Sequence, residues 1–73
     1  MDAVLVCSDD WEGLFFDGVL ATEGHHISLG TVFEKLIKNG NKVDSFTVRY
    51  CSIEWIEEEG NFPPNLSDVV FAK

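Results

Sequence analysis

Residues 11–23, WEGLFFDGVLATE, decide the fold of this 73-residue chain. Two apolar runs flank Asp17-Gly18, a dipeptide that favours a tight hairpin turn because both central residues of that turn need positive φ. With a two-residue turn, the facing pairs are Phe16 with Val19, Leu14 with Ala21 and Glu12 with Glu23. Both faces of this hairpin are largely apolar. We therefore expect it to lie inside a sheet or to leave one face for a partner.

The segments around the hairpin predict further strands and one main helix. Residues 3–7 form a continuous apolar run, which is typical of a buried strand. Ser28 is a good N-cap, and apolar residues then recur at helical spacing up to the stop signal Asn39-Gly40, which predicts a helix over 29–39. Residues 42–51 alternate in the manner of a β-strand, which we expect to pair with the hairpin.

The last third of the chain predicts a second, shorter helix. Ser52 is a capping residue and Gly60 a stop signal, so a helix over 53–59 is favoured over a longer strand, although its C-terminal glutamates oppose the macrodipole. Residues 61–65 must be extended because prolines disfavour the α region before them. The expected fold is α+β, with an antiparallel sheet of about three to five strands, the 29–39 helix on one face and the 53–59 helix at an edge.

The composition is that of a folded acidic domain. The chain has 13 acidic and 5 basic side chains and a formal charge of −8, yet it is 45 % hydrophobic. Disordered acidic tails lack such apolar content. So negative a surface repels nucleic acid and membrane headgroups and attracts basic proteins. We expect one domain over 1–73, located in the cytoplasm because the N-terminus lacks the basic region of a signal peptide, and a homodimer is an open alternative to the monomer.

Acidic clusters and tryptophans are the candidate partner-binding residues. They are Asp9, Asp10, Trp11, Glu12, Trp55, Glu57, Glu58 and Glu59. A rigid array of carboxylates can replace the phosphates that a nucleic-acid-binding protein recognises, and tryptophans often anchor interfaces. The leading hypothesis is a non-enzymatic protein-binding module, specifically a phage-type inhibitor (anti-defence) of a basic, nucleic-acid-acting host protein. The simpler interpretation is a solvated acidic face, and neither cluster has the ligand spacing of a calcium loop, so no metal is expected.

His25 and His26 precede the cap of the main helix and suggest an alternative. Together with Ser28, Gly30 and Thr31, they can converge on an anion, because the first turn of a helix presents unpaired N–H groups. The alternative function is therefore a binder of a small phosphate-bearing ligand or nucleotide at this helix N-terminus. In the simpler interpretation Ser28 only caps the helix.

The two cysteines and the lack of a catalytic motif indicate that the chain is not an enzyme and needs no cofactor. Cys7 and Cys51 lie in apolar runs, where burial raises the pKa of a thiol and weakens it as a nucleophile. We expect both to be buried free thiols rather than a disulfide framework.

Three strings carry a family resemblance: WEGLFFDGVL at 11–20, EGHHISL at 23–29 and FPPNLSDV at 62–69. They resemble a family of small bacterial and phage proteins of similar length that has no assigned activity. The likeness extends over residues 11–70. It implies a bacterial or phage origin and transfers no site residue.

Overall fold

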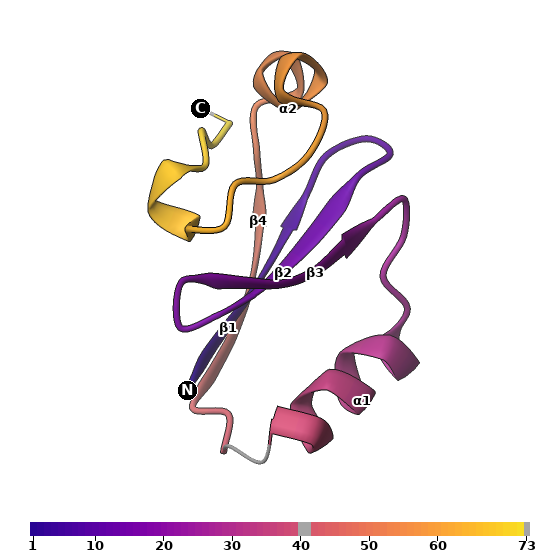
Figure 1. Ribbon diagram of the computed structural model, residues 1–73, viewed down its shortest axis with the longest axis vertical. Helices are drawn as coiled ribbons and strands as arrows, with labels where there is room; N and C mark the ends of the chain where they lie inside the picture. Colours follow the sequence, from indigo (N-terminus) through magenta and orange to yellow (C-terminus); the bar gives the residue numbers. More distant parts are fainter. Residues whose placement is uncertain (40–41, 73) are drawn as a thin grey trace.

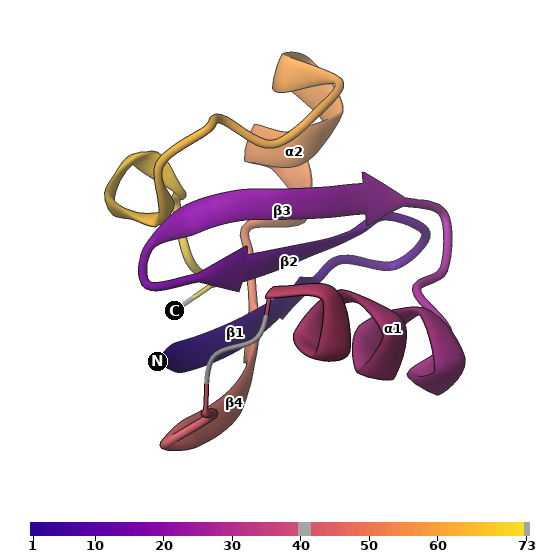
Figure 2. The same ribbon diagram turned by 60° about the horizontal axis from the view of Figure 1, so that its bottom comes forward.

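The computed structural model describes residues 1–39 and 42–72 and confirms the predicted α+β fold. Four strands form one sheet in the order β3-β2-β1-β4 (Figure 1). The strands are β1 (Asp2–Cys7), β2 (Glu12–Phe16), β3 (Val19–Gly24) and β4 (Ser45–Tyr50). The helices are α1 (Leu29–Asn39), α2 (Ile53–Glu59) and the 3-10 turn η1 (Leu66–Asp68). Figure 2 shows α1 on one side of the sheet and α2 with the C-terminal segment on the other.

The predicted hairpin is present, but a β-bulge changes its register. Asp17 and Gly18 both have positive φ, 49° and 82°, as the turn requires. Phe16 faces Val19 as predicted. The facing pairs Leu14 with Ala21 and Glu12 with Glu23 were wrong, because the bulge inserts one extra residue into β3. The observed pairs are Leu14 with Thr22, Gly13 with Glu23 and Glu12 with Gly24.

The sheet is mixed, which corrects the expectation of an antiparallel sheet. β4 pairs with β1 in parallel, from Asp2 with Ser45 to Cys7 with Tyr50, and not with the hairpin. The reason is the connection through α1. It starts at the end of β3, at one edge of the sheet, and brings the chain back to the other edge, where β4 runs in the same direction as β3 and β1. The hairpin edge is also partly occupied, since Leu20 N–H donates to the Pro64 carbonyl at 2.9 Å.

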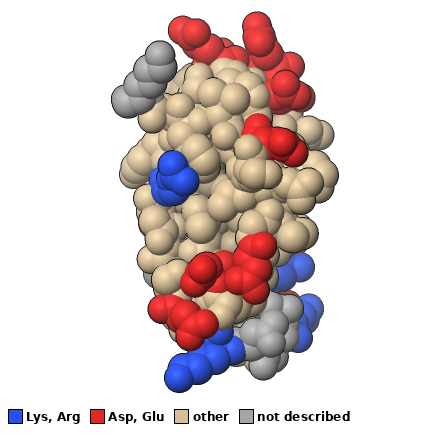
Figure 3. Space-filling view, turned by 90° about the vertical axis from the view of Figure 1, so that its left-hand side faces the viewer, with Lys and Arg blue, Asp and Glu red and all other residues tan. Residues whose placement is uncertain are grey.

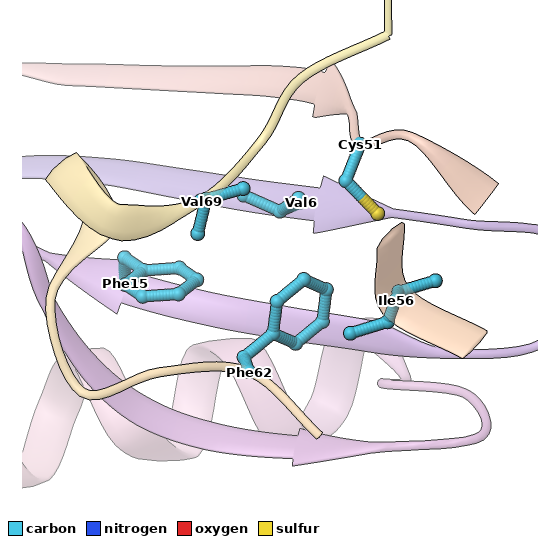
Figure 4. Close-up of a cluster of buried hydrophobic side chains, with 6 residues drawn as sticks. All are labelled: Val6, Phe15, Cys51, Ile56, Phe62 and Val69. Atoms are coloured by element: carbon cyan, nitrogen blue, oxygen red, sulfur yellow. The ribbon is translucent and has the colours of Figure 1, made fainter. Parts of the chain in front are cut away.

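The larger core lies between the sheet and the C-terminal segment. It contains Val6, Phe15, Cys51, Ile56, Phe62 and Val69 (Figure 4). The rings of Phe15 and Phe62 meet edge to face with centroids 5.9 Å apart. Gly13 allows the Phe62 ring to lie directly against β2, because a Cβ on residue 13 would lie 2.5 Å from Phe62 Cδ2. A smaller cluster under α1 contains Leu14, Ile27 and Val32.

Both predicted helices are confirmed, together with their caps. Ser28 Oγ accepts from Thr31 N–H at 3.2 Å, and Ser52 Oγ accepts from Trp55 N–H at 3.3 Å. Gly60 ends α2 with φ 82°. The predicted stop at Gly40 lies outside the described residues. Among the described helices, none combines the length and the apolar character needed to cross a membrane.

The C-terminal segment is attached at both ends by backbone hydrogen bonds. Leu66 N–H donates to the Gly18 carbonyl at 2.8 Å, and Ala72 N–H donates to the Tyr50 carbonyl at 2.9 Å. The segment contains η1, followed by a single bridge between Phe71 and Cys51. This segment therefore closes one face of the sheet without joining it as a full strand.

Candidate functional site

The fold gathers the two predicted acidic clusters at one end of the molecule. We call this the acidic end: Asp9, Asp10, Glu54, Glu57, Glu58 and Glu59, all exposed. Asp10 and Glu57 line one hollow of about 140 Å³, whereas Asp9 and Glu54 line a larger cavity. Figure 3 shows carboxylates gathered at the end of the molecule that α2 forms. The clusters are far apart in sequence and meet because α2 follows β4, which lies beside β1.

The charge of the acidic end is unbalanced. Within the part of the chain that the structure describes, no Lys or Arg forms an ion pair with its carboxylates; the Lys–Glu pair that is present, Lys38 with Glu34 at 3.0 Å, is on α1. The first-turn Glu54 suits the helix dipole, but Glu57, Glu58 and Glu59 lie at the negative end of α2, whose last turn has no basic residue. These side chains therefore lower the stability of the helix and repel one another.

An open cavity of about 630 Å³ lies beside these carboxylates. It is formed by the carboxyl ends of the parallel strands β1 and β4, the start of α2 and residues 70–72. Its apolar lining includes Tyr50, Ile53 and Phe71, and Tyr50 is 65 % exposed. Apolar walls next to Asp9 and Glu54 suit a group with an apolar stem and a positive charge.

The sequence did not indicate this cavity. Tyr50 and Ile53 flank the predicted boundary between strand and helix, which is the only local signal. Phe71 reaches the cavity through the return of the C-terminal segment, and nothing in the residues around it predicts that return.

The two tryptophans predicted to contact a partner are partly used in the core. Trp11 Nε1 donates to Glu23 Oε1 at 2.9 Å, and its ring meets that of His25 edge-on at 4.9 Å. Trp55 packs against Phe62 with centroids 6.2 Å apart. Both tryptophans are half-buried. Trp11 also lines the small hollow that Asp10 and Glu57 line, so part of its side chain lies at the acidic end.

Glu12 is separate from the acidic end and supports the fold. Its Oε1 accepts from Ile27 N–H at 2.7 Å, and its Oε2 accepts from Cys7 Sγ at 3.5 Å. This half-buried carboxylate fixes the loop that leads into α1. The bulge in β3 explains why Glu12 does not face Glu23 as predicted. Glu12 lies on the α1 side of the sheet, and Glu23 lies on the other side.

The residues of the phosphate-site alternative do not converge on one point. His25 packs on Trp11, whereas His26 Nδ1 lies 3.4 Å from Glu12 Oε1. Ser28 Oγ is occupied by Thr31, with its hydroxyl at 3.0 Å and its N–H at 3.2 Å. Gly30 is exposed. A carboxylate beside His26 opposes anion binding, so Ser28 serves as a helix cap.

The two thiols are buried and free, as predicted. Burial, reinforced by the nearby Glu12 carboxylate, raises the pKa of the Cys7 thiol to about 11. Burial also raises the pKa of the Cys51 thiol. Both are therefore poor nucleophiles at neutral pH. Over residues 1–39 and 42–72, no group of three or more His, Cys, Asp or Glu side chains is arranged to hold a metal ion.

Comparisons of the chain with protein-family models, with curated proteins and with solved structures find no match. The function is therefore inferred from the geometry and charge of the acidic end.

Proposed function

We propose that this chain is a non-enzymatic protein-binding module whose acidic end engages a basic partner. The observation that carries the proposal is the gathering of exposed carboxylates on α2 and the β1–β2 turn, none of which forms an ion pair with a described Lys or Arg. Their arrangement costs helix stability. Cations supplied by a partner offset that cost and favour rapid association.

The cavity provides an anchor point for this partner. An Arg or Lys side chain can lay its methylene stem against Ile53 and place its charge near Asp9 and Glu54. The guanidinium of Arg49 already lies over the Phe71 ring, 3.5 Å from its centroid, so Phe71 offers the partner less apolar surface. Tyr50 adds an exposed aromatic ring, which attracts a guanidinium in particular. Charge and apolar contact then act at the same place, as they do at the centre of many interfaces.

A narrower form of the proposal concerns the kind of partner. Surfaces that are basic and adjacent to apolar contacts are typical of proteins that bind nucleic acid, and carboxylates can occupy the positions of phosphates. The module then acts as an inhibitor that competes with nucleic acid, as a phage-type anti-defence protein acts on a host nucleic-acid-acting protein.

A pull-down from bacterial lysate tests the proposal. Tagged protein is incubated with lysate at low and high salt, and mass spectrometry identifies both the proteins and the small molecules that are retained. We expect a basic protein that high salt releases. A retained nucleotide without a protein would contradict the proposal and would support the alternative site at His25 and His26.

A further inference from the structure

We propose that the outer edge of β4 pairs with the same strand of a second copy, in antiparallel orientation. β4 is the last strand of the sheet order, and all six of its residues are exposed. Natural proteins block such edges with lysines, prolines or bulges. SFTVRY, the sequence of β4, contains no proline and no lysine, and its register with β1 is continuous. Its one charged residue, Arg49, has its guanidinium over the Phe71 ring, 3.5 Å from the centroid.

The backbone groups available for pairing belong to Phe46 and Val48. Cys51 N–H donates toward β1, to the Cys7 carbonyl at 3.0 Å, whereas the Tyr50 carbonyl accepts from Ala72 on the opposite side. Successive residues of a strand direct their N–H and C=O groups alternately to its two sides. The groups of Phe46 and Val48 therefore point away from β1, where β4 has no neighbouring strand in the sheet.

These free groups select one register for the pair. If the two-fold axis passes through Thr47, Phe46 faces Val48 of the second copy, and the two residues exchange N–H and C=O hydrogen bonds. Symmetry repeats the same exchange on the other side of the axis. A pair centred on Val48 would instead require the outward carbonyl of Tyr50, which already accepts from Ala72. A pair centred on Phe46 would require the N–H of Asp44, which already donates to the Met1 carbonyl at 2.8 Å. The pair centred on Thr47 therefore uses the free groups of both copies.

The side chains are complementary in this register. Phe46 and Val48 align with Ala3 and Leu5 on the α1 side of the sheet, and are 46 % and 49 % exposed. Across the two-fold axis, Phe46 of one copy faces Val48 of the other, and Thr47 faces Thr47. Cross-strand pairs of an aromatic with a β-branched residue and of two threonines are both favourable. A pair of single strands buries less than the roughly 1,200 Å² of a standard interface. We therefore expect a reversible dimer that depends on concentration.

Charge favours a second copy at this edge. β4 is the one strand of the sheet without a carboxylate, whereas Asp2, Glu12 and Glu23 lie in the other three. Asp44, which directly precedes β4, is paired with the Met1 amino group. Two chains of charge −8 therefore bring fewer carboxylates together at β4 than at the other strands. The acidic end lies at the carboxyl end of β4, so antiparallel pairing places the two acidic ends at opposite ends of the dimer, each free for a partner.

Sedimentation equilibrium over a wide concentration range tests the pairing. We expect the mass of the wild-type chain to rise from 8.2 kDa toward twice that value. The double variant Phe46→Lys/Val48→Lys places like charges opposite each other and should stay monomeric. Phe46→Lys/Val48→Glu places Lys opposite Glu and should recover the dimer, although it is the more negative of the two. Val19→Lys, an exposed apolar position on the other edge strand, is the matched control and should dimerise like the wild type.

Several results would overturn the proposal. They are a wild-type mass of 8.2 kDa at every concentration, dimerisation of the Lys/Lys variant, or failure of the folded Lys/Glu variant to dimerise.

Hydrogen exchange tests the pairing on the wild-type chain, without any substitution. The amides of Phe46 and Val48 should gain protection as concentration rises, and equal exchange at all concentrations would contradict the pairing. Capture of an unrelated extended segment by a monomeric wild type would also exclude the second copy as occupant.

Discussion

The indole nitrogen of Trp11 donates a hydrogen bond to Oε1 of Glu23 at 2.9 Å. The same oxygen accepts from Phe62 N–H at 3.0 Å, so one carboxylate connects the start of β2, the end of β3 and the segment after α2. We predict that Glu23→Ala lowers the free energy of unfolding by about 1–3 kcal/mol, because two partly buried donors lose their acceptor. Glu23→Gln retains a neutral acceptor and should lose less. Urea unfolding measures both, and equal stability of wild type and Glu23→Ala would show that the contact is unimportant.

The contact between Gly13 and Phe62 gives a second stability prediction. Gly13→Ala places a methyl group against the Phe62 ring, which must move, and we expect a loss of about 1–3 kcal/mol. Gly24 lies in the same hairpin with open space around its Cβ position, so Gly24→Ala is the control and should be neutral or slightly stabilising. Thermal unfolding compares the two variants. Similar melting temperatures for both would contradict the packing described for Phe62.

We expect the glutamates of the acidic end to lower the free energy of unfolding. Glu57→Lys and Glu58→Lys exchange unfavourable for favourable charges at the C-terminus of α2, so each should stabilise the chain by about 0.3–1 kcal/mol. The gain should shrink as salt is added. Urea unfolding at low and high salt measures it. A loss of stability in both variants would mean that these glutamates have structural partners after all.

The Cys7 thiol makes stability fall at alkaline pH. Its pKa is raised in the folded state, from about 9 to about 11, chiefly by burial and further by Glu12. Because the unfolded chain loses this proton first, the contribution to stability is complete below pH 9 and is lost between about 9 and 11. Cys7→Ala should flatten the pH dependence of the unfolding midpoint in that window. An unchanged slope in Cys7→Ala would assign the pH dependence to other groups.

Local sequence signals predicted the elements of this fold but not their arrangement. The hairpin turn follows from the positive φ that Asp17-Gly18 tolerates, and both helices follow from their serine caps. The bulge in β3 and the parallel pairing of β4 could not be predicted in this way, because they depend on the crossover of α1 and on long-range contacts. The same limit applies to the site. The carboxylates were identified by charge, whereas the meeting of Asp9 with Glu54 and the cavity beside them required the tertiary structure.

The most direct test of the acidic end is binding by two variants of equal charge. Glu57→Lys/Glu58→Lys changes the acidic end, whereas Glu34→Lys/Asp68→Lys changes exposed carboxylates outside it. Two reversals add four charges to −8, so both variants have a formal charge of −4. The measurement is the amount of salt-sensitive basic protein that each variant retains from bacterial lysate. The account predicts that the first variant loses this protein and the second retains it. Equal retention by both, or equal loss, would contradict a binding site at the acidic end.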